Sequence, residues 1–119
     1  GNQFKHRKRK LPEKKIYNMI VIGSARMLAD VRNLVKCYQL RGNIHYIEGK
    51  GHVLSDGHQS LPLDYSAYDT VVYDLDVYSF ETILRLLETT PGHTLRLATY
   101  STRTGVLITE DAVYERCVL

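Results

Sequence analysis

The feature that most constrains this chain is an apolar run that ends at a glycine and passes directly into a helical pattern. Residues 16–22 read Ile-Tyr-Asn-Met-Ile-Val-Ile, and Gly23 follows them. Such a run is typical of a central parallel strand that is covered on both faces. Ser24 is a suitable N-cap for the helix that comes next. The sequence therefore predicts the first strand, turn and helix of a nucleotide-binding α/β sheet.

Strands and helices continue to alternate along the rest of the chain. The first helix is expected from residue 24 to about residue 40, with an apolar stripe of Leu28, Val31, Val35 and Tyr38. Further strands are expected over 43–48, 69–76, 94–99 and 106–109, and a second helix, capped by Ser79, over 80–89. Alternation of this kind indicates right-handed crossovers and a parallel sheet. We therefore expect an α/β fold, a three-layer Rossmann-like sandwich with a mainly parallel sheet of four to five strands.

The net charge of +3 hides two unlike parts of the chain. Residues 1–15 carry seven Lys or Arg and one acid, which gives a charge of +6. Residues 16–119 carry nine Lys or Arg and twelve acids, which gives a charge of −3. We therefore divide the chain into a basic arm, 1–15, and a Rossmann-like domain, 16–119. A nucleic-acid-binding domain would carry its positive charge on the folded part, so no nucleic-acid partner is expected.

Three interpretations of the basic arm stay open: a solvated terminus, a juxtamembrane segment and a nucleic-acid arm. The most specific of these is the juxtamembrane segment, in which Lys and Arg contact anionic lipid at the cytoplasmic membrane face. The chain starts with Gly1 rather than Met, which we interpret as a tag remnant on a fragment of a longer protein. An upstream membrane segment would then place the domain at the cytoplasmic face of the inner membrane.

The two cysteines, Cys37 and Cys117, have no spacing typical of a metal site. We expect unpaired thiols, which fit a reducing, cytosolic compartment. The sequence has no apolar run of about 18 residues, so no membrane-spanning helix is expected within it.

Gly23, Ser24 and Ala25 are the first candidate ligand-binding residues. A glycine permits the tight exit from the strand, and backbone N–H groups at the start of the helix can receive a phosphate. Ala25 and Leu28 occupy the second and third glycine positions of the usual G-x-G-x-x-G pattern. Two interpretations therefore stay open: a nucleotide site, or a glycine that serves the turn alone.

Acidic and basic residues at other strand ends add further candidates. Glu48 ends the second predicted strand, where a carboxylate commonly holds a ribose, and Lys50 could meet a phosphate. The alternative for both is an ordinary polar loop. Asp74 and Asp76 could form a metal or acid–base pair, or a solvated strand end. No catalytic residue and no metal site is assigned.

Two segments carry a family resemblance: the basic run 4–10 and the stretch Tyr-Asn-Met-Ile-Val-Ile-Gly-Ser at 17–24. Together they resemble the cytosolic Rossmann-like domain that follows membrane helices in bacterial cell-surface polysaccharide enzymes. The similarity is to the C-terminal domain of some family 2 glycosyltransferases, and to the CoA-binding-like domain of polyprenyl-phosphate sugar transferases and sugar-nucleotide dehydratases. It extends over 69–74, 79–88 and 102–105.

The resemblance implies a nucleotide at Gly23, Ser24 and Ala25, with Glu48 on the ribose. It also implies that the residues that transfer the sugar lie elsewhere in the full-length protein. We therefore expect a non-catalytic accessory domain of a bacterial glycosyltransferase, which binds a nucleotide or nucleotide-sugar. The alternatives are an NAD(P)-binding domain of a sugar-nucleotide oxidoreductase or dehydratase, and a ligand-free domain that self-associates as a homodimer.

Overall fold

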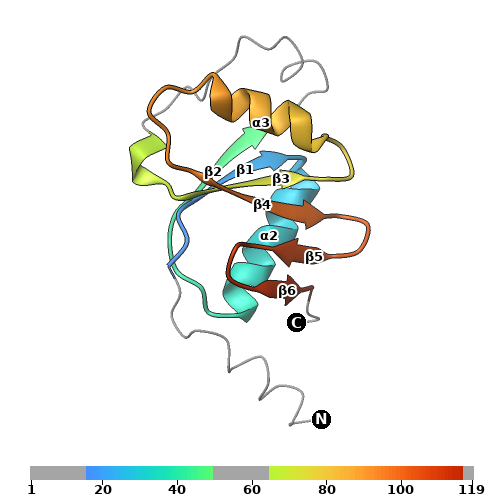
Figure 1. Cartoon of the computed structure of the whole chain (residues 1–119). Coiled ribbons are helices and arrows are strands. Elements are labelled where there is room, and N and C mark those ends of the chain that lie inside the picture. The colour runs from blue at the N-terminus through green and yellow to red at the C-terminus, as the bar shows by residue number, and fades with distance from the viewer. Residues whose placement is uncertain (1–15, 50–64, 117–119) are drawn as a thin grey trace.

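The computed structural model describes residues 16–49 and 65–116, which form one mixed sheet with two α-helices (Figure 1). The strands are β1 (Met19–Gly23), β2 (Ile44–Glu48), β3 (Thr70–Asp74), β4 (Arg96–Ser101), β5 (Val106–Ile108) and β6 (Val113–Glu115). The helices are α2 (Ala25–Cys37) and α3 (Phe80–Glu88), with a short 3-10 helix, η1 (Tyr65–Ala67). The basic arm and Lys50 lie outside the described residues.

The strand order in the sheet is β2-β1-β3-β4-β5-β6. The first four strands are parallel, and β5 and β6 are added antiparallel as a meander after β4. The α/β class and the parallel part of the sheet are confirmed, but the predicted count of four to five strands is wrong, because the sheet has six. The missed strand, β6, has three residues, too few to show a readable alternation.

Strand β1 separates two hydrophobic clusters. Met19 and Val21 face α2, and Ile20 and Ile22 face α3, as the two-residue period of a strand requires. The cluster beneath α3 contains no residue of β5 or β6. Figure 1 shows the reason, since α3 lies at the β1–β2 end of the sheet. The predicted three-layer sandwich is therefore not confirmed.

Helix α2 uses a different apolar stripe from the predicted one. Met27, Val31 and Leu34 are buried against the sheet. Of the four predicted residues, Val31 is thus central, whereas Leu28, Val35 and Tyr38 are partly buried at the flank of the same cluster. The Tyr38 ring packs edge-on against Tyr114 of β6, with ring centroids 4.9 Å apart. The strand that the sequence did not reveal therefore explains why this flank of the helix is apolar.

The prediction of unpaired thiols is wrong for Cys37, which is disulfide-bonded. The other cysteine of the sequence, Cys117, lies outside the described residues. Sequence spacing could not reveal the bond, because pairing depends on which chain segments the fold brings together. The disulfide at Cys37 removes the support that free thiols would give to a reducing compartment.

We expect a thiol titration of the unfolded, unreduced protein to detect no free thiol, and to detect both cysteines after reduction. Reduction should also lower the melting temperature, because a disulfide typically contributes about 2–4 kcal/mol to stability. Two reactive thiols in the protein before reduction would contradict the bond.

Gly42 holds the link between α2 and β2 against the start of β1. Its φ of 133° is one that side-chain-bearing residues rarely adopt, and a Cβ there would collide with the Tyr17 carbonyl. The residues on either side fasten the same contact, because Arg41 O accepts from Tyr17 N at 2.6 Å and Asn43 O accepts from Met19 N at 2.8 Å.

We expect Gly42→Ala to lower the free energy of unfolding by roughly 2–4 kcal/mol, measured by urea denaturation. Gly92→Ala is the matched control: Gly92 has a φ of 70° but no atom within 4 Å of an added Cβ. It should cost only about 1 kcal/mol, the backbone penalty alone. Equal losses in the two variants would show that the contact with Tyr17 is unimportant.

Candidate functional site at the carboxyl ends of β1, β3 and β4

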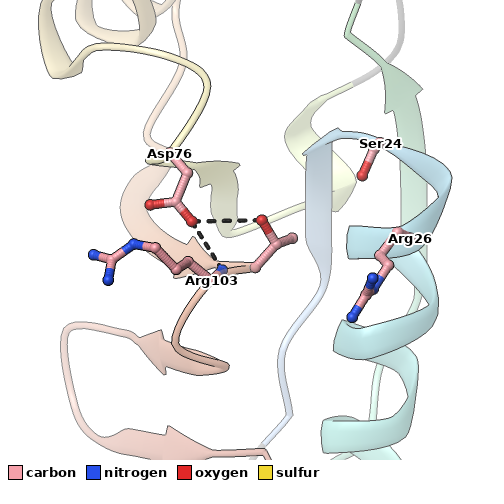
Figure 2. A pocket seen from close by; sticks show the side chains of 5 residues that line it. Ser24, Arg26, Asp76 and Arg103 are labelled. Atoms are coloured by element: carbon pink, nitrogen blue, oxygen red, sulfur yellow. Dashed lines mark hydrogen bonds between the residues drawn. The ribbon is translucent and has the colours of Figure 1, made fainter.

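The chain leaves β1 and β3 toward opposite faces of the sheet. β1 leads into α2, which packs on one cluster, and β3 leads into α3, which packs on the other. Adjacent parallel strands whose connections diverge leave a crevice at their carboxyl ends, where α/β proteins bind ligands. A pocket of about 480 Å³ lies there, lined by Ser24, Arg26, Asp76, Thr102 and Arg103 (Figure 2).

The first turn of α2 supplies hydrogen-bond donors to this pocket. Ser24 is the N-cap, as predicted, and its Oγ accepts from Met27 N at 3.1 Å. Within the described residues, the N–H groups of Ser24, Ala25 and Arg26 have no acceptor. These are the groups that a helix N-terminus leaves for water or an anion.

Gly23 is required by packing around it, whatever binds nearby. Its carbonyl accepts from Gly49 N at 3.0 Å and from Tyr46 Oη at 3.2 Å. A Cβ at position 23 would collide with the sulfur of Met27, which is fully buried. The structure therefore supports the interpretation that this glycine serves the turn, and ligand contacts fall to the residues after it.

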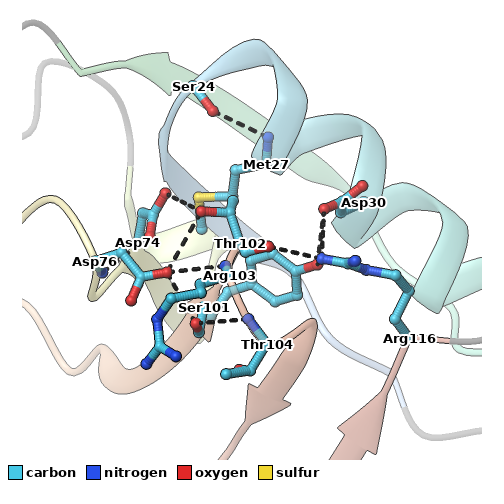
Figure 3. A network of polar contacts seen from close by, with 11 residues as sticks. Ser24, Met27, Asp30, Asp74, Asp76, Ser101, Thr102, Arg103, Thr104 and Arg116 are labelled. Atoms are coloured by element: carbon cyan, nitrogen blue, oxygen red, sulfur yellow. Dashed lines mark hydrogen bonds and ion pairs between the residues drawn. The ribbon is translucent and has the colours of Figure 1, made fainter.

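Asp74 and Asp76 fasten the turn between β4 and β5 (Figure 3). Asp76 Oδ2 accepts from Ser101 Oγ at 2.8 Å and from Arg103 N at 3.0 Å. Thr102 Oγ1 lies 3.4 Å from both Asp74 Oδ2 and Asp76 Oδ2. These bonds hold Thr102 and Arg103 next to α2 and give both aspartates a structural role. Asp74 is buried, whereas Asp76 is exposed at the strand end and lines the pocket.

The pKa values of the two carboxyl groups are shifted in opposite directions. Asp74 is 1% exposed, and this burial raises the pKa of its carboxyl above the usual value. The hydrogen bond from Arg103 N, followed by the one from Ser101, lowers the pKa of Asp76. Asp76 is therefore ionised at neutral pH and is a weak base. In the described part of the chain, no three His, Cys, Asp or Glu side chains could together hold a metal ion.

The predicted site residues are only partly brought together. Gly23, Ser24 and Ala25 lie at the β1–α2 junction, as expected. Glu48 is exposed at the end of β2, in register with Gly23, but it does not line the pocket. Lys50 lies outside the described residues, so its role stays a prediction.

Sequence reasoning did not assign Arg26, Thr102 or Arg103 to the site, although all three line the pocket. The available signal was their position after β1 and β4, because the carboxyl ends of parallel strands meet at one edge. Figure 2 shows Asp76 and Arg103 on one side of the pocket and Ser24 and Arg26 on the other. The described residues of the lining include two arginines and the helix N-cap Ser24, groups that are suited to binding an anion.

No protein-family model matches this chain, and comparisons with curated proteins and with solved structures gave no match. Among the described residues, no helix is long and apolar enough to cross a membrane.

We expect Asp76→Ala to lower the melting temperature at about pH 6, with a smaller effect for Asp76→Asn, which keeps an acceptor. The folded-state pKa of Asp76 is lowered, so its ionised form stabilises the fold above the unfolded pKa. That contribution disappears as the pH falls through the folded pKa. Thermal melts at about pH 6 and pH 2.5 should therefore show the gap between wild type and Asp76→Ala shrinking in acid. A gap that is independent of pH would contradict this role.

Proposed function

We propose that this chain is a non-catalytic domain that binds a phosphate-bearing ligand at the carboxyl ends of β1, β3 and β4. One observation carries the proposal: the first turn of α2, whose Ser24, Ala25 and Arg26 N–H groups have no acceptor among the described residues, borders a pocket lined by Arg26 and Arg103. Helix N-termini attract anions, and guanidinium groups match the geometry of phosphate oxygens.

A nucleotide or nucleotide-sugar is the ligand that the sequence resemblance favours. Under that proposal the domain is an accessory part of a bacterial glycosyltransferase, and the basic arm contacts the membrane surface. Packing at the first turn argues against a dinucleotide such as NAD. The sulfur of Met27 fills the space beside Gly23, and Ala25 and Leu28 replace the glycines that allow close approach of a pyrophosphate.

The test is isothermal titration of the whole chain with inorganic phosphate and with UMP. We expect Arg26→Gln to weaken binding roughly threefold to tenfold, because it removes a charge-assisted hydrogen bond. Arg103→Gln should weaken binding less, because the Arg103 guanidinium points away from Ser24 and Arg26 (Figure 2). Binding should also weaken as the salt concentration rises.

Arg32→Gln is the matched control, because it removes the same charge from an exposed position of α2 that does not line the pocket. It should leave the affinity nearly unchanged. If the wild-type chain binds neither ligand, the proposal fails. If all three variants weaken binding equally, the effect is one of net charge and the pocket is not the site.

A further inference from the structure

The pocket offers an acceptor as well as anion-binding groups. The Oδ2 of Asp76 receives the bonds from Ser101, Thr102 and Arg103, whereas its Oδ1 receives none from the described residues. Asp76 is exposed and lines the pocket. An ionised oxygen in this position repels a phosphate but accepts hydrogen bonds from hydroxyl groups. The lining therefore matches a ligand that carries both kinds of group.

The side of β1 that faces β2 and Glu48, away from the pocket, is packed with side chain and backbone atoms of Tyr78 and Gly49. The bond from Gly49 N to Gly23 O keeps β1 and β2 paired at their carboxyl ends. Tyr78 reaches across from the start of α3, and its Oη packs so closely on Gly49 that a Cβ there would collide with it. The Oη of Tyr78 is buried and has no hydrogen-bond partner among the described residues. Among the described residues, Tyr78 therefore occupies the space beside Gly49, next to Glu48.

We infer that the ligand extends from the first turn of α2 toward Asp76, Thr102 and Arg103, and that it is a small phosphate monoester of a polyhydroxylated compound. This inference rests on the proposed phosphate site and names its ligand class. The phosphate contacts the α2 amides and Arg26, and hydroxyl groups donate to Asp76. The pocket volume of about 480 Å³ suits a small ligand.

Titration of the whole chain with inorganic phosphate, glycerol 3-phosphate and NAD tests the inference. We expect glycerol 3-phosphate to bind roughly threefold to tenfold more tightly than phosphate, the contribution of one or two exposed hydrogen bonds. NAD should bind no more tightly than phosphate. If phosphate itself does not bind, the proposed function fails. If phosphate binds but glycerol 3-phosphate has no advantage, or NAD binds most tightly, the inference alone fails.

Two charge-neutralising variants locate the hydroxyl contact. Asp76→Asn should reduce the preference for glycerol 3-phosphate over phosphate to about one, measured as the ratio of the two dissociation constants of the same variant. Glu48→Gln, the matched control, should keep the full preference. The reverse pattern would overturn the inference.

Amide chemical shifts of the wild-type chain give a second measurement that does not depend on the folding of Asp76→Asn. The shifts caused by glycerol 3-phosphate beyond those caused by phosphate should fall on residues 101–103. Differences confined to residues 47–49 would place the ligand on the β2 side and overturn the inference.

Discussion

Burial of β1 between two strands and two helices is the constraint on which the rest of the structure depends. All five residues of β1 are buried, and it pairs in parallel with β2 on one side and β3 on the other. Its alternate side chains enter different hydrophobic clusters, one beneath each helix. Because β1 leads to α2 and β3 leads to α3 on the other face, the position of the pocket follows from the way this central pair is covered.

The polar network at the pocket links stability to binding. A buried carboxylate, Asp74, and an exposed one, Asp76, fix the β4–β5 turn, and that turn carries Thr102 and Arg103. The cost of burying Asp74 is offset by the hydrogen bonds from Asp76 N and Thr102. Oδ2 of Asp76 thus holds the turn, while Oδ1 accepts no hydrogen bond from the described residues.

The end of the sheet formed by β5 and β6 is less completely covered than the centre. The face toward α2 is buried, with Leu107 and Tyr114 at most 1% exposed. On the opposite face the paired residues Ile108 and Val113 are 46% and 54% exposed, because α3 lies over the other end of the sheet. The exposed edge of β6 is partly protected, since the hydroxyl of Tyr38 bonds to both N and O of Glu115.

The sequence by itself determined the local elements of this protein. The apolar run before Gly23, the caps Ser24 and Ser79, and the alternation of strands and helices predict β1, α2, α3 and a parallel sheet, because these signals arise from neighbouring residues. Only the tertiary structure decided the remainder. It added β6, shifted the buried stripe of α2 to Met27, Val31 and Leu34, and formed the bond at Cys37. It also brought Arg26 and Arg103 to one pocket and left Glu48 outside. Several of these outcomes depend on contacts between distant segments, such as Tyr38 and Glu115, which are 77 residues apart, and no local pattern encodes such contacts.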